Sequence, residues 1–152
     1  MNSDALFINL LSDFGFKRMF GTTRNKTILI NMLNSFLAKH VGVITEVEFL
    51  PTELLGFIES EKKVNFDLYC TTQNNDNIII EMQRASQKFF SDRIISYVSR
   101  AISNNIEKGD MEYNIPTVVS LNLMDHNSNL FKQKKDFFRQ VMLKDEENEI
   151  FF

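Results

Sequence analysis

The sequence predicts an α/β (α+β) fold in which a β-sheet is flanked by helices. Residues 64–84 contain two runs of alternating side chains separated by a polar stretch of Gln, Asn and Asp. This pattern is typical of two antiparallel strands joined by a short loop. On either side of these runs, apolar residues recur at helical spacing over residues 25–40 and 86–108. We therefore expect a central hairpin covered by amphipathic helices.

Length and composition bound the classes of protein that the chain can form. It has 152 residues, of which 43% are hydrophobic, and a net charge of −3. This length suffices for one hydrophobic core, and we expect residues 1–152 to form a single domain. The acidic balance argues against a protein that coats nucleic acid uniformly, although a local basic groove is compatible with it.

Cysteine, histidine and hydropathy give further constraints. The one cysteine, Cys70, cannot form an internal disulfide, which favours a reducing, cytoplasmic environment. No apolar run approaches the ~20 residues of a membrane span, so we expect no membrane association. The histidines, His40 and His126, lie far apart, and no Cys/His pair has the spacing of a structural zinc site.

Three helices are predicted in the first third of the chain. Residues 3–11 and 13–20 each suit a short helix, the second with Asp13 as its N-cap and Gly21 as its stop. Residues 25–40 suit a longer helix. Its expected apolar face comprises Ile28, Leu29, Met32, Leu33, Phe36 and Leu37.

Further strands are predicted on both sides of the hairpin. Residues 43–50 alternate and are expected to form the first strand. Residues 118–124 are mostly apolar, which predicts a central strand. The last segment, residues 136–152, has the pattern of two strands around an Asp-Glu-Glu-Asn turn.

The helix predicted over residues 86–108 has Ser86 as its expected cap. Arg93, Tyr97 and Arg100 are spaced i, i+4 and i+7 and therefore share one side of it. Without further information, the arginines are solubilising surface residues and the tyrosine lies at the edge of the core.

The hairpin brings two carboxylates together if its loop has an odd number of residues. Centred on Asn74, the register places Asp67 opposite Glu81. Directly opposed side chains have Cβ atoms about 4.5–5.5 Å apart, and like charges there repel. A divalent cation would offset the repulsion. A two-residue turn at Asn74 and Asn75 would instead put the carboxylates on opposite faces.

The same alternation assigns the remaining hairpin side chains to faces. Phe66, Leu68 and Cys70 are expected on one face, and Tyr69 with Asp67 on the other. A plainer interpretation is that Asp67 and its partner carboxylate are solvated residues on the outer face of a half-exposed sheet.

Five motifs, in order, carry a resemblance to a known family. They are D-F-G-F-K-R-M-F-G at 13–21, K-K-V-N-F-D at 62–67, I-I-E-M-Q at 79–83, D-R-I-I-S-Y-V-S-R at 92–100 and G-D-M-E-Y-N-I-P-T-V-V-S-L at 109–121. Together they resemble the PD-(D/E)XK nucleases, and more narrowly the transposase-associated branch that includes the recombination-promoting nucleases. The resemblance implies a restriction-endonuclease-like core with a mixed sheet of four to five strands. Members of the branch usually continue further, so we expect the chain to be truncated at its C-terminus or to be a short, degenerate member.

The resemblance also implies a site. Asp67 and Glu81 would bind Mg²⁺ or Mn²⁺, the main-chain carbonyl of Met82 would be a further ligand, and Asp13 is the candidate to complete the metal site. Gln83 stands where the family-defining lysine normally lies, and it is expected to act with the two carboxylates in catalysis. An amide can position a water molecule but brings no positive charge.

The missing charge could come from Lys63 or Arg84, and the sequence does not decide between them. Phosphate contacts with DNA are expected from a wider set of residues. These are Lys17, Arg18, Lys63, Arg84, Arg93, Tyr97 and Arg100.

Two functional hypotheses follow. The first is a Mg²⁺-dependent DNA endonuclease connected with recombination, mobile elements or defence. The second is a non-catalytic module that keeps the fold and binds nucleic acid or a protein. The sequence leaves open whether the substrate is double-stranded DNA, single-stranded DNA or RNA, and whether the chain forms a homodimer.

Overall fold

The computed structural model describes residues 9–54, 63–84, 88–106, 115–124, 137–144, 146–147 and 149. The helical elements in this part of the chain are α1 (Asp13–Phe20), the 3-10 helix η1 (Thr23–Asn25), α2 (Lys26–Val41) and α3 (Phe90–Asn104). The strands are β1 (Val47–Phe49), β2 (Glu53–Leu54), β3 (Val64–Asn65), β4 (Leu68–Thr72), β5 (Asn77–Gln83) and β6 (Val118–Met124).

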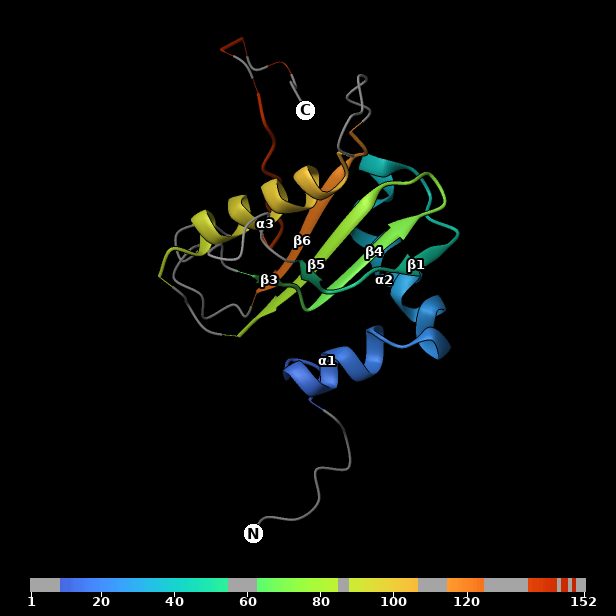
Figure 1. Cartoon of the computed structure of the whole chain (residues 1–152). Helices are drawn as coiled ribbons and strands as arrows, with labels where there is room; N and C mark the ends of the chain where they lie inside the picture. Colours follow the sequence, from blue (N-terminus) through green and yellow to red (C-terminus); the bar gives the residue numbers. More distant parts are fainter. Residues whose placement is uncertain are drawn as a thin grey trace.

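A four-stranded mixed sheet forms the centre of the molecule (Figure 1). Its strand order is β1-β4-β5-β6, in which β1, β4 and β5 are antiparallel neighbours and β6 runs parallel to β5. Strands β2 and β3 form a separate antiparallel pair. A mixed sheet flanked by helices confirms the predicted fold class.

The sheet has a hydrophobic core on each face. Residues of α1 and α2, including Phe16 and Leu33, pack with Ile78 and Ile80 of β5 in the first core. Ile79 of β5 packs in the second core, which includes residues of α3. Successive strand residues point to opposite faces, so β5 contributes to both cores. Figure 1 shows α3 lying along one face of the sheet.

The hairpin has the register expected for an odd-numbered loop, and not that of a two-residue turn at Asn74 and Asn75. Leu68 pairs with Ile80, and Cys70 pairs with Ile78. The Thr72 N–H donates to the Asp76 carbonyl at 2.9 Å, which closes an odd-numbered loop around Asn74. Beyond the Leu68–Ile80 pair, this register places Asp67 opposite Glu81.

The first arm of the hairpin is interrupted, which corrects the prediction for Phe66. β3 ends at Asn65, the chain bends at Asp67, and β4 begins at Leu68. The Phe66 N–H donates to the Thr52 carbonyl at 2.9 Å, so this residue continues the β2–β3 pairing. Its ring consequently packs in the second core, and its assignment to the face of Leu68 was wrong.

The first helices differ in detail from the prediction. Ser12, not Asp13, caps α1, because the Ser12 Oγ accepts a hydrogen bond from the Gly15 N–H at 3.0 Å. Gly21 follows the end of α1 as predicted. α2 begins at Lys26 after η1, and Ile28 is 43% exposed instead of joining the apolar face. Of the helix predicted over residues 3–11, only residues 9–11 are described, and they are not helical.

The strand predicted over residues 43–50 is shortened to β1. The backbone N–H and carbonyl of Ile44 bond to the Asn34 side chain at 2.8 and 2.7 Å. The Gln73 Oε1 accepts the N–H groups of Thr45 and Glu46. Side chains therefore satisfy the backbone of this segment in place of a strand ladder.

The elements after the hairpin also depart from the prediction. α3 begins at Phe90 after Phe89, whose φ is 62°; the predicted cap, Ser86, lies outside the described residues. β6 is the last strand of the sheet that the described residues form, which differs from the central position expected for it. Residues 137–143 form no strand, and Lys144 makes only an isolated β-bridge.

None of the helices in the described residues is long and apolar enough to cross a membrane. The cysteine is buried, as its position on the core face of the hairpin predicts.

Gly21→Ala should destabilise the protein, because α1 approaches β4 closely at this position. An added Cβ would lie 2.6 Å from the Leu68 Cδ2 and 2.8 Å from the Lys17 carbonyl oxygen. Overpacking of this kind costs about 1–3 kcal/mol. Urea denaturation of the variant and of Lys39→Ala, an exposed helical control, measures the cost. Equal stabilities of the two variants would contradict the close approach.

Candidate active site

Asp67 and Glu81 lie together, and each carboxylate accepts a hydrogen bond from a backbone N–H at or next to the other residue. The Asp67 N–H donates to the Glu81 Oε1 at 3.2 Å, and the Met82 N–H donates to the Asp67 Oδ2 at 2.8 Å. Glu81 is only 6% exposed, and the Asp67 side chain is 24% exposed. The interpretation of Glu81 as a solvated surface residue is therefore wrong, because α3 packs on this face of the sheet, whereas Asp67 keeps partial contact with solvent.

Burial and repulsion both act on Glu81. Burial raises the pKa of its carboxyl to about 7, and the neighbouring Asp67 charge contributes to this rise. The hydrogen bond from the Asp67 N–H and the charges of Arg93 and Lys17 oppose the rise in the Glu81 pKa. The carboxyl of Glu81 therefore holds its proton to a higher pH than an ordinary glutamate.

Lys17 approaches the pair from α1. Its Nζ lies 2.7 Å from the Asp13 Oδ1 and 3.8 Å from the Asp67 Oδ1. The hydrogen bond with Asp13 is the main cause that raises the pKa of Lys17, and the charges of Asp67 and Glu81 act in the same direction. The Lys17 ammonium group therefore lies between Asp13 and Asp67 and interacts with both carboxylates.

Gln83 and Arg93 meet on the same face of the sheet as Glu81. Gln83 is 8% exposed, and its Oε1 accepts a hydrogen bond from an Arg93 guanidinium nitrogen at 2.7 Å. The guanidinium carbon lies 5.5 Å from the ring centroid of Phe90 and 5.7 Å from that of Tyr97. Burial, and then the Glu81 charge, raise the pKa of Tyr97. α3 therefore directs Arg93 and Tyr97 toward the carboxylates.

Asn122 is a polar neighbour that the sequence analysis did not identify. It pairs with Glu81 in the parallel β5–β6 register, which places both side chains on one face. Its Nδ2 donates to the carbonyl and the Oγ of Ser120, whereas its buried Oδ1 has no hydrogen-bond partner among the described residues. Only the pairing of β6 with β5, which leaves no local signal in the sequence, brings Asn122 to Glu81.

The remaining predicted cations differ in their surroundings. Lys63 bonds to the Glu53 Oε1 at 3.1 Å. Arg18 and Arg84 are exposed, and Arg100 is half-buried on α3. In the described part of the chain, no group of three or more His, Cys, Asp or Glu side chains is placed to hold a metal ion. Asp13 does not form a three-acid cluster there, because it reaches Lys17 one helical turn further on.

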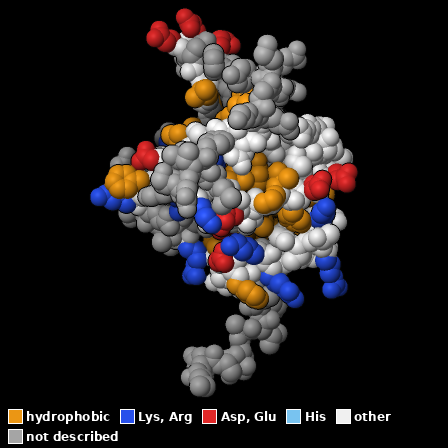
Figure 2. All heavy atoms as spheres, viewed as in Figure 1, with side chains coloured by type: hydrophobic (Ala, Val, Ile, Leu, Met, Phe, Trp, Pro, Cys, Tyr) orange, Lys and Arg blue, Asp and Glu red, His pale blue; other side chains and the backbone are white. Residues whose placement is uncertain are grey.

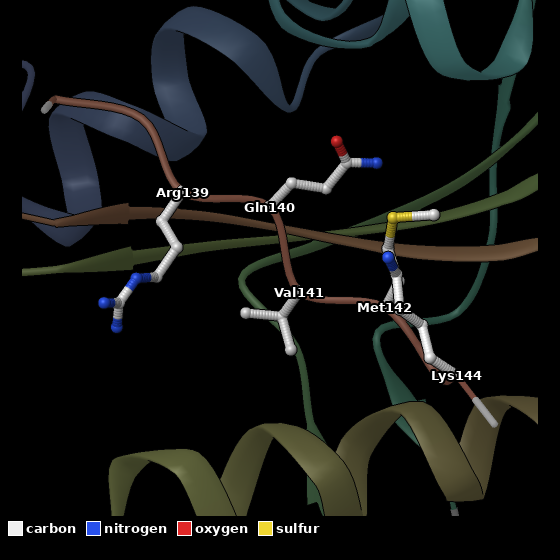
Figure 3. A pocket seen from close by; sticks show the side chains of 5 residues that line it. All are labelled: Arg139, Gln140, Val141, Met142 and Lys144. Carbon is white, nitrogen blue, oxygen red and sulfur yellow. The ribbon is translucent and has the colours of Figure 1, made fainter. Parts of the chain in front are cut away.

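The surface around α1 mixes both charges. Figure 2 shows acidic and basic side chains gathered side by side on the viewed face. A separate hollow of about 460 Å³ is lined by Arg139, Gln140, Val141, Met142 and Lys144 (Figure 3). Arg139 and Val141 point one way and Gln140 the other, as in an extended chain. None of these residues belongs to the carboxylate site.

A mixed sheet that carries a backbone-locked Asp–Glu pair between flanking helices agrees with the PD-(D/E)XK nuclease fold. Residues 10–152 match the sequence model of the PD-(D/E)XK nuclease family transposases, and the chain belongs to this family. No curated protein and no solved structure matched the chain.

The pKa of Glu81 predicts how stability depends on pH. Its native pKa of about 7 exceeds the ordinary value of 4.5, so the native state binds the proton more tightly than the unfolded state does. The stabilisation that this tighter proton binding gives is complete below pH 4.5 and is lost as the pH rises to about 7. The free energy of unfolding should fall by about 3 kcal/mol over this range.

Urea denaturation in EDTA between pH 4.5 and 7.5 tests this dependence against Glu81→Gln, which cannot ionise. The free energy of unfolding of the parent, relative to that of the variant, should fall by about 3 kcal/mol over this pH range. A difference that stays constant with pH would contradict the assigned environment of Glu81.

Proposed function

We propose that this protein is a metal-dependent endonuclease that hydrolyses phosphodiester bonds in DNA. The Asp67–Glu81 pair is the observation that carries the proposal. Burial, and then the neighbouring Asp67 charge, raise the pKa of Glu81, and a divalent cation would offset both effects. Membership of a nuclease family supports the same chemistry.

The donor atoms fit a hard cation such as Mg²⁺ or Mn²⁺. Asp67 and Glu81 offer carboxylate oxygens, and the buried Asn122 Oδ1 lies on the same face without a hydrogen-bond partner among the described residues. Oxygen ligands of this kind suit Mg²⁺ and Mn²⁺. By resemblance to the family, the Met82 carbonyl is a further ligand. When bound, the cation supplies an acidic water molecule and charge stabilisation at the phosphate.

The surrounding residues would bind and orient the substrate. Lys17 and Arg93 bring positive charge to the carboxylates from α1 and α3. The hydroxyl of Tyr97 is protonated at neutral pH, as in any tyrosine, and burial raises its pKa further. Arg18, Lys63, Arg84 and Arg100 are proposed to contact DNA phosphates without reading bases.

The alternative is a non-catalytic module that retains the nuclease fold. One observation favours it: Gln83, which replaces the family-defining lysine, has no charge of its own. The family description supports a role connected with mobile elements for either activity.

Divalent metal should stabilise the parent protein but not Asp67→Asn/Glu81→Gln. At about 100 times the Kd, binding adds about 2.7 kcal/mol, or about 5–10 °C in Tm for a chain of this size. The amides keep the acceptors for the two backbone N–H groups but remove the repulsion, so the double variant should melt higher than the parent in EDTA. Thermal melts with EDTA, Mg²⁺ and Mn²⁺ measure both effects. The same metal response in both proteins would contradict the site.

Nicking of supercoiled plasmid DNA tests the activity. With Mg²⁺ or Mn²⁺ the parent should convert supercoiled plasmid to open circles, and Glu81→Gln should lower the rate about 10²-fold or more, as expected for loss of a catalytic group. Single-stranded DNA and RNA assayed in parallel identify the preferred substrate. A parent that binds DNA but cuts none of these substrates would establish the non-catalytic alternative.

A further inference from the structure

The contact between Gln83 and Arg93 suggests where the missing positive charge comes from. We infer that Arg93 is the cation that stabilises the scissile phosphate, and that Gln83 is the positioning residue that holds it beside Glu81. This inference rests on the proposed nuclease function and deepens it. It replaces Lys63 and Arg84 as the expected sources of the charge.

The geometry supports this division of roles. Gln83 follows Glu81 by two positions on β5, so both side chains lie on the face covered by α3. The 2.7 Å hydrogen bond to the Gln83 Oε1 fixes the guanidinium on that face. The rings of Phe90 and Tyr97 restrict it further. The Arg93 charge also acts directly on Glu81, where it opposes the rise in pKa.

The identity of residue 83 follows from the position of Arg93. A lysine at this position would direct an ammonium at the guanidinium, and two cations at hydrogen-bond distance repel strongly in a half-buried environment. A glutamine oxygen accepts from the guanidinium instead and leaves its charge intact. The Gln–Arg pair therefore carries the same single positive charge as a lysine, and a guanidinium matches the geometry of a phosphate better.

Lys17 is the competing source of charge. Its Nζ lies 3.8 Å from the Asp67 Oδ1 but is hydrogen-bonded to Asp13 at 2.7 Å, so an acidic partner already compensates its charge.

Four variants separate a catalytic charge from a structural contact. Arg93→Gln removes the positive charge, and Arg93→Lys keeps it. Gln83→Glu keeps the hydrogen-bond acceptor but neutralises the charge of Arg93. The double variant Gln83→Lys/Arg93→Gln moves the positive charge to β5. Lys39→Gln, exposed in the last turn of α2, is the matched control for net charge.

The expected pattern is specific to a charge at the phosphate. Arg93→Gln should nick plasmid about 10²–10³-fold more slowly than the parent at saturating DNA. Gln83→Glu should melt no lower than the parent in EDTA yet lose at least tenfold in rate. Gln83→Lys/Arg93→Gln should nick plasmid at least tenfold faster than Arg93→Gln. Arg93→Lys should also retain more activity than Arg93→Gln. Lys39→Gln should nick at the rate of the parent.

The outcomes distinguish this inference from the proposed function. An inactive parent refutes both. An active parent with Arg93→Gln and Gln83→Glu equally active overturns only the role of Arg93, and a loss in Lys17→Gln alone would transfer that role to Lys17. If Arg93→Gln fails to fold, the rate and Tm of Gln83→Glu decide: a Tm equal to the parent's with full activity overturns the inference.

Discussion

The site depends on a reciprocal pair of hydrogen bonds between β5 and the bend at Asp67. The Met82 N–H binds the Asp67 carboxylate, while the Asp67 N–H binds the Glu81 carboxylate. Burying a carboxylate is costly unless its oxygens are hydrogen-bonded. The bend at Asp67 ends the β4–β5 ladder. The backbone N–H groups of Asp67 and Met82 therefore bind carboxylate side chains, where continued strands would bind each other's backbone.

The charges around this pair come from both layers of helices. α1 belongs to the core on one face of the sheet and contributes Lys17. α3 belongs to the core on the other face and contributes Arg93, which is held by Gln83. The two carboxylates therefore lie where cations from opposite layers reach the same end of the hairpin. This balance limits the rise in the Glu81 pKa and keeps that group ionisable near neutral pH.

Local patterns predicted the centre of the site well and its surroundings poorly. The alternation of residues 64–84 placed Asp67 opposite Glu81 on the condition of an odd-numbered loop, because strand side chains repeat every two residues, and the structure has that loop. Phe66 was misplaced because its backbone pairs with Thr52, a contact that alternation cannot reveal. β6 was placed centrally because its residues are apolar, whereas it is the last strand of the sheet that the described residues form.

The sequence by itself determined the fold class, the hairpin and the family, since alternation within each strand and the order of the motifs along the chain are legible in it. The tertiary structure decided which charges reach the carboxylates. Lys17 and Arg93 are 50 and 26 residues from Asp67 along the chain, and Asn122 is adjacent to Glu81 only because β6 runs parallel to β5. The packing of α1 and α3 on opposite faces of the sheet set these distances, and no local periodicity encodes how two separate elements pack.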